Sequence, residues 1–238
     1  MSKVSVITIN YNNAGGLEKT IKSVIAQTFF DFEFILIDGN SSDNSVEVIK
    51  KYSDKINYWI SEKDNGIYNA QNKGISAAKG EYCLFLNSGD TLVNDTVLKT
   101  IFFNHASADI IYGNMQTINE QQSIQHLKMP AAIGQKQLLR DTLWHPVSFI
   151  KRELFLKYGN YNEAFKIVAD YEFFVRVIIA KKVTLKYVPV EVSVFDTSGL
   201  SSDANKKNQL IAERKKVQDM YFNPLILFLF RLYSKLRN

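Results

Sequence analysis

Short apolar runs alternate with segments whose apolar residues recur at helical spacing along the first half of the chain. The runs predict strands and the three- and four-residue spacing predicts helices with one buried face. The expected strands are residues 4–9, 32–37, 58–60, 82–86 and 109–113. The expected helices are residues 17–25, 43–52, 67–78 and 95–103. This alternation predicts βαβ crossovers, and therefore an α/β fold with a mostly parallel sheet flanked by helices on both faces.

The pattern changes after Gly113 to shorter strand candidates mixed with helices. The expected strands are residues 115–118, 124–127, 147–150, 184–188 and 192–195. The expected helices are residues 135–139, 153–158 and 169–180. No internal repeat, low-complexity tract or linker interrupts this part of the sequence. We therefore expect one domain with a C-terminal appendage.

Each of the first four expected strands ends on polar side chains. Asn10 and Tyr11 follow the first strand, and Asp38, Asp64 and Asp90 follow the next three. In open α/β sheets, ligands bind outside the carboxyl ends of the strands. One loop carboxylate is an ordinary turn residue, but four consecutive strands that bring polar groups to one edge predict a ligand site there.

Composition and charge narrow the class of protein. The 238 residues are 46% hydrophobic, which is ample for a core. One cysteine excludes an internal disulfide framework, and the N-terminus lacks the features of an export signal, so we expect a cytoplasmic protein. Of the net charge of +5, residues 206–238 carry eight Lys or Arg against two Asp or Glu. A basic excess confined to the tail argues against nucleic-acid binding, which uses basic side chains spread over a folded face.

Familiar nucleotide-binding and hydrolase motifs are missing from the sequence. Residues 10–16 read NYNNAGG, which lacks the glycine spacing of a dinucleotide-binding loop, and neither a triphosphate loop nor a serine elbow is present. His105, His126 and His145 lack metal-ligand spacing, and Cys83 alone cannot complete a zinc site. Carboxylates remain, and a few carboxylates suit Mg²⁺ or Mn²⁺ held jointly with the phosphate oxygens of a nucleotide diphosphate.

Six motifs in order resemble one enzyme family. They read VSVITINYN, SVIAQTF, FEFILIDGNSSDNS, SEKDNGIYNAQNKGI, GEYCLFLNSGD and ADYEFFVR. The chain is thereby similar to family-two inverting nucleotide-sugar glycosyltransferases of the GT-A fold. The resemblance implies a glycosyltransferase domain over residues 1–203, with a nucleotide-binding half at 1–113 and a smaller, partly antiparallel acceptor-side half at 114–203. Residues 204–238 would form a basic C-terminal helical tail.

The resemblance also implies the residues of the donor site. Tyr11 would lie against the nucleotide base, and Asp38 would accept hydrogen bonds from it. Asp64 and a turn at Asn72-x-Gly74 would close on the nucleotide and diphosphate. Asp90, the last residue of the motif NSGD, matches the family's cation ligand and would hold Mg²⁺ or Mn²⁺ together with diphosphate oxygens and water.

The acceptor side of the site follows from the chemistry and the resemblance together. Inverting transfer needs a base that takes the proton from the acceptor hydroxyl, whereas a diphosphate leaving group needs no acid if a cation neutralises its charge. Asp170 matches the family's acid at the start of a helix and is the implied base. His145 is implied to contact the acceptor or the diphosphate. Glu172 is expected to be an exposed helix charge that pairs with Arg176.

Three positions depart from the family pattern. Gln71 stands where many relatives have Arg, and Asn87 and Gly89 stand where many have acids. These departures leave open a catalytically degenerate relative that binds nucleotide sugars without turnover. A sugar-nucleotide pyrophosphorylase is a further alternative, although the loop after the first strand has no basic residue of the kind such an enzyme needs.

The tail combines charge with an apolar run. Residues 206–221 predict a basic helix, and residues 225–230 are uniformly apolar. Six residues span only about 9 Å as a helix, too short to cross a bilayer. The run could lie in the interface of an anionic membrane, as would suit an enzyme that extends a lipid-linked saccharide for bacterial surface polysaccharide, or it could pack on the body or on a second subunit. Residues 198–202 are expected to form a lid or an ordinary loop.

Overall fold

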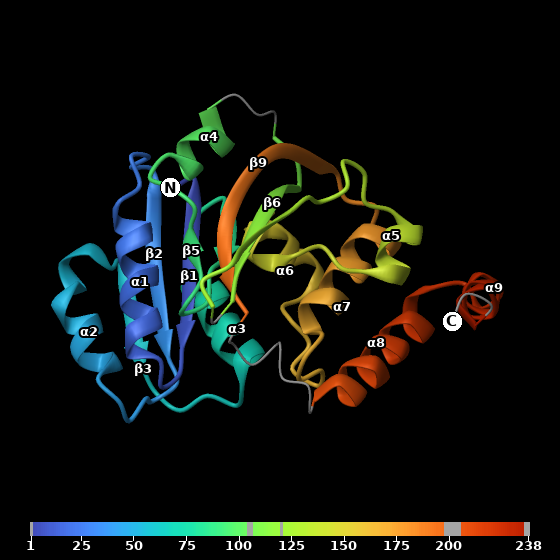
Figure 1. Ribbon diagram of the computed structural model, residues 1–238, viewed down its shortest axis with the longest axis horizontal. Helices are drawn as coiled ribbons and strands as arrows, with labels where there is room; N and C mark the ends of the chain where they lie inside the picture. Colours follow the sequence, from blue (N-terminus) through green and yellow to red (C-terminus); the bar gives the residue numbers. More distant parts are fainter. Residues whose placement is uncertain (1, 104–106, 120, 198–205, 236–238) are drawn as a thin grey trace.

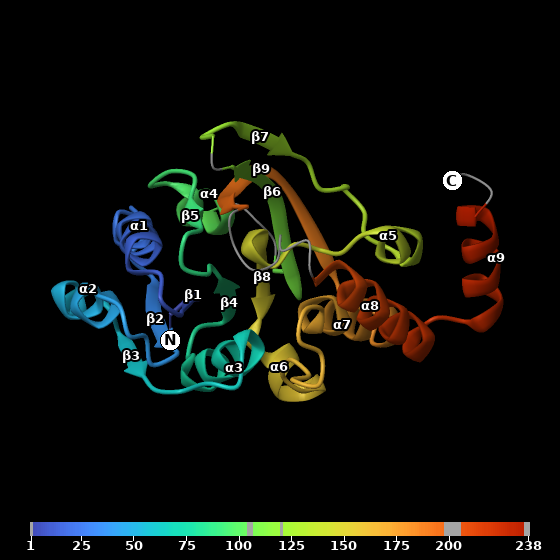
Figure 2. The same ribbon diagram turned by 60° about the horizontal axis from the view of Figure 1, so that its bottom comes forward.

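The computed structural model describes residues 2–103, 107–119, 121–197 and 206–235. One mixed sheet runs through the molecule in the order β3-β2-β1-β4-β8-β6-β9-β5, with β7 paired to β6 (Figure 1 and Figure 2). The strands are β1 (Val4–Asn10), β2 (Phe32–Asp38), β3 (Tyr58–Ser61), β4 (Tyr82–Phe85), β5 (Thr91–Leu92), β6 (Ile110–Ile118), β7 (Ile124–Leu127), β8 (Ser148–Lys151) and β9 (Leu185–Asp196).

Helices surround the sheet, and the C-terminal helices extend beyond it (Figure 2). The helices are α1 (Ala14–Ile25), α2 (Ser45–Lys51), α3 (Ile67–Ala77), α4 (Val97–Phe103), α5 (Gln135–Arg140), α6 (Arg152–Tyr158), α7 (Ala169–Val175), α8 (Lys207–Tyr221) and α9 (Pro224–Lys235). Shorter turns are η1 (Ser53–Lys55), η2 (His145–Val147) and the π-helical η3 (Arg176–Ala180), which continues α7. Figure 2 shows α1 and α2 on one side of β1 and β2, with α3 on the other.

The first half of the sheet is parallel, as the sequence predicts. β1 pairs in parallel with β2 on one side and β4 on the other, and β2 pairs in parallel with β3. All seven residues of β1 and all four of β4 are buried, which is typical of central parallel strands covered on both faces. The register sets Asn10 opposite Asp38. The polar residues that follow these strands therefore meet at one edge.

The second half differs from the prediction in how many strands it has. The strands expected at 109–113 and 115–118 are one strand, β6, and those expected at 184–188 and 192–195 are one strand, β9. The two long strands pair in parallel through a register shift beside Gly113. A Cβ atom at Gly113 would lie 2.6 Å from the Val190 carbonyl oxygen, so only glycine allows this approach. Pro189 cannot donate to a ladder and occurs within the bulge.

Antiparallel pairing joins the two halves. β8 pairs antiparallel with both β4 and β6, and β7 and β5 pair antiparallel with β6 and β9. The strand expected at 147–150 begins one residue later, because residues 145–147 form the turn η2 around Pro146. β5 has only two residues and leaves no periodic signal. The predicted α/β class, with a mostly parallel core and a smaller antiparallel part, is confirmed.

The C-terminal helices differ from each other in how they pack. α8 lies along α7, and α9 turns away from the body at Asn223 and contacts α8 (Figure 2). Arg214 of α8 stacks over the Tyr171 ring at 4.1 Å, and the Gln218 side chain donates to the Leu139 carbonyl. Within the described part of the chain, none of the helices combines the length and hydropathy needed to cross a bilayer. The segment expected as a lid, residues 198–202, and the expected boundary at 203/204 lie outside the described residues.

Candidate active site

Asp38 holds the loop after β2. Its carboxylate is fully buried and accepts hydrogen bonds from the Asn10 amide (2.7 Å), the Ser61 hydroxyl (2.6 Å), and both the hydroxyl and the backbone N–H of Ser41 (2.6 and 3.0 Å). Burial alone would raise the pKa of Asp38, but these hydrogen bonds outweigh it and the pKa lies below its ordinary value. Asp38 is therefore ionised, and its hydrogen bonds hold the loop after β2 at the carboxyl edge of the sheet.

Tyr11 and Asp64 meet above this loop. The Tyr11 side chain is 65% exposed, and Asp64 is half-buried. A Cβ atom at Gly39 would lie 2.6 Å from Oδ2 of Asp64 and 3.2 Å from Cδ2 of Tyr11, so both side chains border Gly39. An aromatic face beside a carboxylate can stack on a planar ring and accept a hydrogen bond from its edge. Gly39 was not predicted as part of the site. Its place directly after β2, at the ligand edge of the sheet, is the signal that could have identified it.

Asn72 is hydrogen-bonded to the segment that precedes α7. Its amide donates to the Tyr161 carbonyl (3.0 Å) and the Glu163 carboxylate (2.8 Å), and it accepts from the Tyr161 N–H (3.1 Å). The expected turn at Asn72-x-Gly74 is wrong, because both residues lie inside α3. A Cβ at Gly74 would lie 2.4 Å from Cγ2 of Ile7, so the glycine lets α3 pack closely on β1. Asn72 ties α3 to the segment before α7.

The loop after β4 is held by helix α1. Gly89 has φ of +107°, a left-handed conformation that favours glycine. The Thr20 hydroxyl accepts from the Gly89 N–H (3.0 Å) and donates to the Asp90 carbonyl (2.7 Å). The polar end of the strand is thus a rigid loop rather than a simple turn, and its conformation determines where the Asp90 side chain lies.

Asp90 is a buried carboxylate with one oxygen available. It is 3% exposed, and its Oδ1 accepts from the Asp196 backbone N–H (3.1 Å). Its Oδ2 has no hydrogen-bond partner among the described residues. Burial raises the pKa of Asp90 to about 7, and the nearby Asp196 carboxylate adds to this effect. A group with a raised pKa and an unpartnered oxygen suits a bound cation.

Asp196, at the end of β9, lies beside the site but was not among the residues predicted from the sequence. A Cβ at Gly89 would lie 3.7 Å from Cβ and 3.8 Å from Oδ2 of Asp196, so this side chain borders the Asp90 loop. Like the other edge residues, Asp196 is a carboxylate that directly follows an apolar run, and that signal could have identified it.

The donor set at this point fits a hard divalent cation. Asp90 and Asp196 carry carboxylate oxygens, the type of ligand atom that Mg²⁺ and Mn²⁺ prefer. In the described part of the chain, no three His, Cys, Asp or Glu side chains gather closely enough to hold a metal by themselves. Sites of this kind bind the cation through one or two carboxylates together with substrate phosphates.

Asp170 and His145 form the second half of the site. Asp170, at the first turn of α7, lies with Oδ2 3.3 Å from Nδ1 of His145, and its Oδ1 accepts from the Tyr68 hydroxyl (2.9 Å) and the Tyr171 N–H (2.8 Å). Burial would raise the pKa of Asp170, but His145 and these hydrogen bonds outweigh it and lower the pKa below its ordinary value. Asp170 is therefore an ionised, oriented carboxylate.

Amide side chains connect His145 to the loop after β4. Nε2 of His145 lies 3.4 Å from Nδ2 of Asn87, and Oδ1 of Asn87 accepts from Nε2 of Gln71 (3.2 Å). Two of the positions that depart from the family pattern are thus in contact with each other and with the site. His145 thus contacts both Asp170 and the loop that ends in Asp90. The structure therefore brings the Asp90 loop and the pair His145 and Asp170 to one edge of the sheet.

Helix α8 supports the segment that leads into α7. The Glu213 carboxylate accepts from the backbone N–H groups of Lys166 (3.1 Å), Ile167 (3.0 Å) and Val168 (3.3 Å). No hydrogen bond from the side chain of the N-cap residue itself caps α7. Glu213 supplies a carboxylate at the positive end of this helix. The sequence offers no local signal for this contact, because the partners are 45 or more residues apart.

The expectation for Glu172 is half right. It pairs with Arg176, with 3.2 Å between Oε1 and Nε, as predicted. It is 1% exposed rather than solvent-facing, because α8 covers it. The Tyr221 hydroxyl donates to the same carboxylate. Glu172 therefore joins α7 to α8.

Taken together, the edge holds an exposed aromatic ring beside one carboxylate, a pair of carboxylates suited to a cation, and a separate ionised carboxylate beside an imidazole. Such a set can bind a base and its diphosphate and can take a proton from a hydroxyl group.

Comparisons with known proteins agree with this arrangement. A family model described as "Glycosyl transferase family 2" matches residues 5–169. An uncharacterized glycosyltransferase of Mycobacterium tuberculosis is 30% identical over 223 residues, which are 92% of this chain and 84% of that protein. The cholesterol galactosyltransferase of Borreliella burgdorferi is 31% identical over 209 residues, 76% of this chain and 57% of that protein.

Solved structures share the fold. Residues 1–349 of Staphylococcus aureus TarS in complex with UDP-GlcNAc superpose with a TM-score of 0.66 at 20% identity, covering 82% of this chain and 58% of that one. The mannosyltransferase PcManGT from Pyrobaculum calidifontis, in complex with GDP-Man and Mn²⁺, gives a TM-score of 0.61 at 15% identity over 81% of this chain and 56% of that one. The chain thus spans well under two thirds of these neighbours.

Proposed function

Because the chain belongs to glycosyl transferase family 2 and is a glycosyltransferase, we propose that it moves a sugar from a nucleotide-diphosphate sugar to a hydroxyl group of a saccharide, with inversion. The observation that carries this proposal is the meeting of the Asp90 loop and Asp170 at one edge, where His145 contacts both Asp170 and Asn87 of that loop. One carboxylate is suited to the diphosphate side of a donor and the other to an incoming hydroxyl.

The proposed reaction is a single displacement. The acceptor oxygen attacks the anomeric carbon while its proton passes to the Asp170 carboxylate, and the bond from that carbon to the phosphate oxygen breaks on the opposite face. The electron pair of the broken bond leaves with the nucleoside diphosphate. Asp170 remains ionised at neutral pH because its pKa is lowered, so it is in the correct state to accept the proton.

The donor side is assigned from the contacts at the edge. Tyr11 stacks on the base and Asp64 accepts a hydrogen bond from it, because both border Gly39 and keep exposed surface. Asp38 and Asn72 take part as supports, since their polar atoms are already paired with Ser41, Ser61 and residues 161–163. TarS with UDP-GlcNAc and PcManGT with GDP-Man support a nucleotide-sugar donor.

Mg²⁺ or Mn²⁺ belongs to this proposal as the cofactor. Asp90 and Asp196 would hold it, and PcManGT, whose complex contains Mn²⁺, supports the assignment. When bound, the cation would neutralise charge on the departing diphosphate. Asp90 and Asp196 orient the donor at its phosphate end, while Asp170 and His145 lie on the acceptor side.

The experiment combines a donor panel with two variants. UDP-, GDP- and dTDP-sugars are screened with Mn²⁺ by thermal shift for binding and by nucleoside diphosphate release for turnover. Asp170→Asn should retain donor binding and lose about 10²- to 10⁴-fold in kcat, the range typical of a general base. Asp90→Ala should weaken Mn²⁺-dependent donor binding. Asp54→Asn, an exposed acid in η1, is the matched control.

Two outcomes would contradict the proposal. If wild type and both variants are equally inert while a donor still binds, the protein is a degenerate binding relative. If the wild type instead makes a nucleotide sugar from a sugar phosphate and a nucleoside triphosphate, with release of pyrophosphate, it is a pyrophosphorylase.

We further propose that the acceptor is a lipid-linked saccharide of a bacterial surface polysaccharide and that the tail meets the membrane. In this assignment residues 1–113 bind the donor, residues 114–203 face the acceptor, and residues 204–238 form the basic tail. The cholesterol galactosyltransferase, whose name contains a lipid, supports an acceptor with a lipid part.

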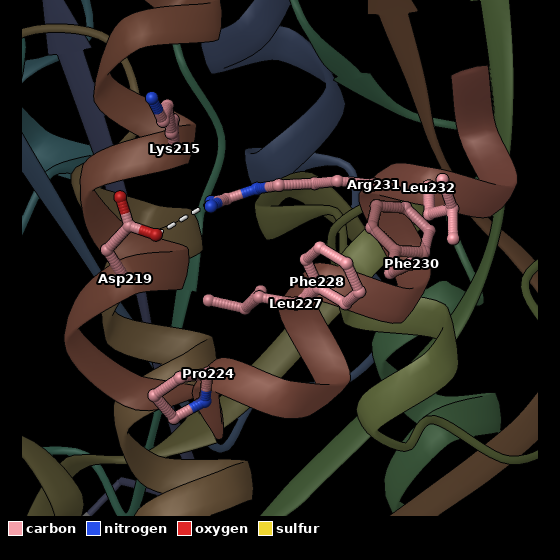
Figure 3. Close-up of a pocket in the computed structure, with 8 residues that line it drawn as sticks. All are labelled: Lys215, Asp219, Pro224, Leu227, Phe228, Phe230, Arg231 and Leu232. Carbon is pink, nitrogen blue, oxygen red and sulfur yellow. Dashed lines mark hydrogen bonds and ion pairs between the residues drawn. The ribbon is translucent and has the colours of Figure 1, made fainter.

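The surface that would meet lipid is one face of α9. Leu225, Phe228, Leu229 and Leu232 follow the i, i+3, i+4, i+7 spacing and are 48–65% exposed. Leu227 is buried toward α8, and Arg231 reaches across to Asp219 with 2.7 Å between Nη2 and Oδ1, beside a groove of about 860 Å³ (Figure 3). The excess of six positive charges in residues 206–238 complements anionic lipid.

Vesicle sedimentation tests this surface without any activity measurement. The full chain should pellet with phosphatidylcholine vesicles that contain about 30% phosphatidylglycerol and remain in the supernatant with phosphatidylcholine alone, because anionic lipid attracts the basic tail. Phe228→Ser with Leu229→Ser should abolish pelleting, whereas Phe103→Ser, an exposed apolar residue on α4, should not. Failure to pellet, or light scattering that shows a dimer lost in the double variant, would overturn the membrane assignment.

A further inference from the structure

Four side chains form a continuous row across the edge. Gln71 of α3 contacts Asn87 after β4 (3.2 Å), Asn87 contacts His145 of η2 (3.4 Å), and His145 contacts Asp170 of α7 (3.3 Å). Gln71 is 2% exposed, and His145 and Asp170 have side chains that are 18% and 17% exposed. The row joins the donor-side loop to the proposed base. Gln71 and Asn87 are two of the residues that distinguish this chain from the family pattern.

The row has one consistent direction of hydrogen bonding. Gln71 donates its amide N–H to Oδ1 of Asn87, which leaves the Asn87 NH₂ group facing Nε2 of His145. An NH₂ group can only donate, so Nε2 must carry a lone pair. The single ring proton of a neutral imidazole then lies on Nδ1 and faces Oδ2 of Asp170, which can only accept.

The reverse direction is disfavoured by Asp170. If Asn87 presented its carbonyl to Nε2, a neutral ring would carry its proton there, and the Nδ1 lone pair would face the ionised Asp170 carboxylate. Two acceptors in contact repel, and a buried polar atom without a partner costs about 1–3 kcal/mol. With a neutral ring, the row is therefore ordered from Gln71 to Asp170.

An acid at position 87, as in many relatives, could not play this part. A carboxylate only accepts hydrogen bonds, so it would need a proton on Nε2 of His145. Asn87 accepts from Gln71 and donates to His145 with one side chain, which an aspartate cannot do. An arginine at position 71 would likewise introduce a charge into a position that is 2% exposed.

We propose that Gln71 and Asn87 are positioning residues that hold His145 as the neutral, Nδ1-protonated tautomer with its proton directed at Asp170. Both oxygens of Asp170 are then fixed, one by His145 and the other by Tyr68 and the Tyr171 N–H. Because Asn87 begins the loop that ends in Asp90, the row also links the donor side of the site to the orientation of the base. The catalytic meaning of this link rests on the proposed function.

The tautomer can be measured directly. Long-range ¹H–¹⁵N correlation spectra of the uniformly labelled full chain distinguish Nδ1–H from Nε2–H and from the doubly protonated ring, and His145→Gln assigns the signal. Spectra are recorded at about pH 8, above the ordinary histidine pKa of about 6.5. The wild type should show the Nδ1–H form. His126, exposed and paired with Glu191, is an internal reference.

The variants test each member of the row. Asn87→Asp should replace the Nδ1–H form with Nε2–H or with the doubly protonated ring. Gln71→Ala frees the Asn87 amide to rotate and should give a mixture of tautomers. Asn57→Asp makes the same chemical change at an exposed position before β3 and should leave the His145 signal unchanged. A wild-type Nε2–H tautomer, or an Nδ1–H signal that persists in Asn87→Asp, would overturn the inference.

Activity separates this inference from the proposed function. With a donor from the panel, Asn87→Asp should lower kcat by on the order of tenfold or more and change the donor KM much less, as expected for a misoriented base. If the tautomer behaves as expected while Asp170→Asn keeps full kcat, the row is correct and the base assignment is wrong. If Asp170→Asn is inactive while the tautomer is Nε2–H, the base stands and the row is wrong.

Discussion

Nδ1 of His145 lies 3.3 Å from Oδ2 of Asp170, a contact between a short turn before β8 and the first turn of α7, which are 25 residues apart in the chain. His145 is the largest of the influences that lower the pKa of Asp170 against the effect of burial. The histidine was expected on the acceptor or diphosphate side of the site. The structure places it against Asp170, the proposed base on that side.

Replacing His145 should change the pH dependence of turnover. His145→Leu removes the hydrogen bond to Asp170, so the pKa of Asp170 should rise. A base must be ionised to act, and the acid limb of the kcat profile should therefore move to higher pH, with a lower plateau. His126→Gln, which alters an exposed histidine of β7, should leave the profile unchanged. An acid limb that stays in place in His145→Leu would contradict the coupling.

Asp196 should contribute to cation binding. Asp196→Asn removes one of two carboxylates at the loop and should weaken Mn²⁺ binding in the presence of UDP or GDP by roughly tenfold or more, on the scale seen when groups around a metal are lost. Calorimetric titration of Mn²⁺ into the protein with saturating nucleotide measures this without turnover. Asp109→Asn, at the start of β6, is the control. Equal Mn²⁺ affinity in Asp196→Asn and wild type would exclude Asp196 as a ligand.

Asp38 should stabilise the fold in a pH-dependent way. Its folded-state pKa is below the unfolded value of about 3.9, so its contribution is fully present above that value and is lost as the pH falls through the folded-state pKa. Asp38→Asn should therefore lower the free energy of unfolding by about 1–3 kcal/mol at neutral pH. The difference from wild type should shrink below about pH 4. Urea unfolding at several pH values measures it, and a difference independent of pH would show that the charge is not responsible.

Glu213 should position the segment that precedes the base. Glu213→Gln removes the charge that three consecutive N–H groups share and should cost about 0.5–2 kcal/mol of stability, as for a lost helix cap. Hydrogen exchange at residues 166–168 should accelerate, and kcat should fall more than the donor KM changes. Asp219→Asn alters another acid of α8, which pairs with Arg231, and should leave both readouts unchanged. Protection of residues 166–168 that matches wild type would contradict this role.

Much of the framework was predictable because local patterns determine it. Runs such as Val4–Ile9 and Tyr82–Leu86 have no competing helical period, and central parallel strands must be apolar on both faces. The parallel order then brings Asn10, Asp38 and Asp90 to one edge without further information. The prediction divided β6 and β9 into two strands each, because Gly113 and Pro189 interrupt their apolar patterns. Only the pairing between β6 and β9 shows that each strand continues through the bulge.

The sequence by itself determined the fold class and predicted a ligand edge with Asp64 and Asp90 as candidates, because strand ends are a property of local chemistry. Asp170 was implied only by the family resemblance, because an acid at a helix start is also a common N-cap. Only the tertiary structure decided that Asp196 borders Asp90, that Glu213 supports the segment before Asp170, and that Gln71, Asn87 and His145 form one row. These contacts join residues 16 to 106 positions apart, and side-chain direction across such separations depends on how the sheet and its helices pack.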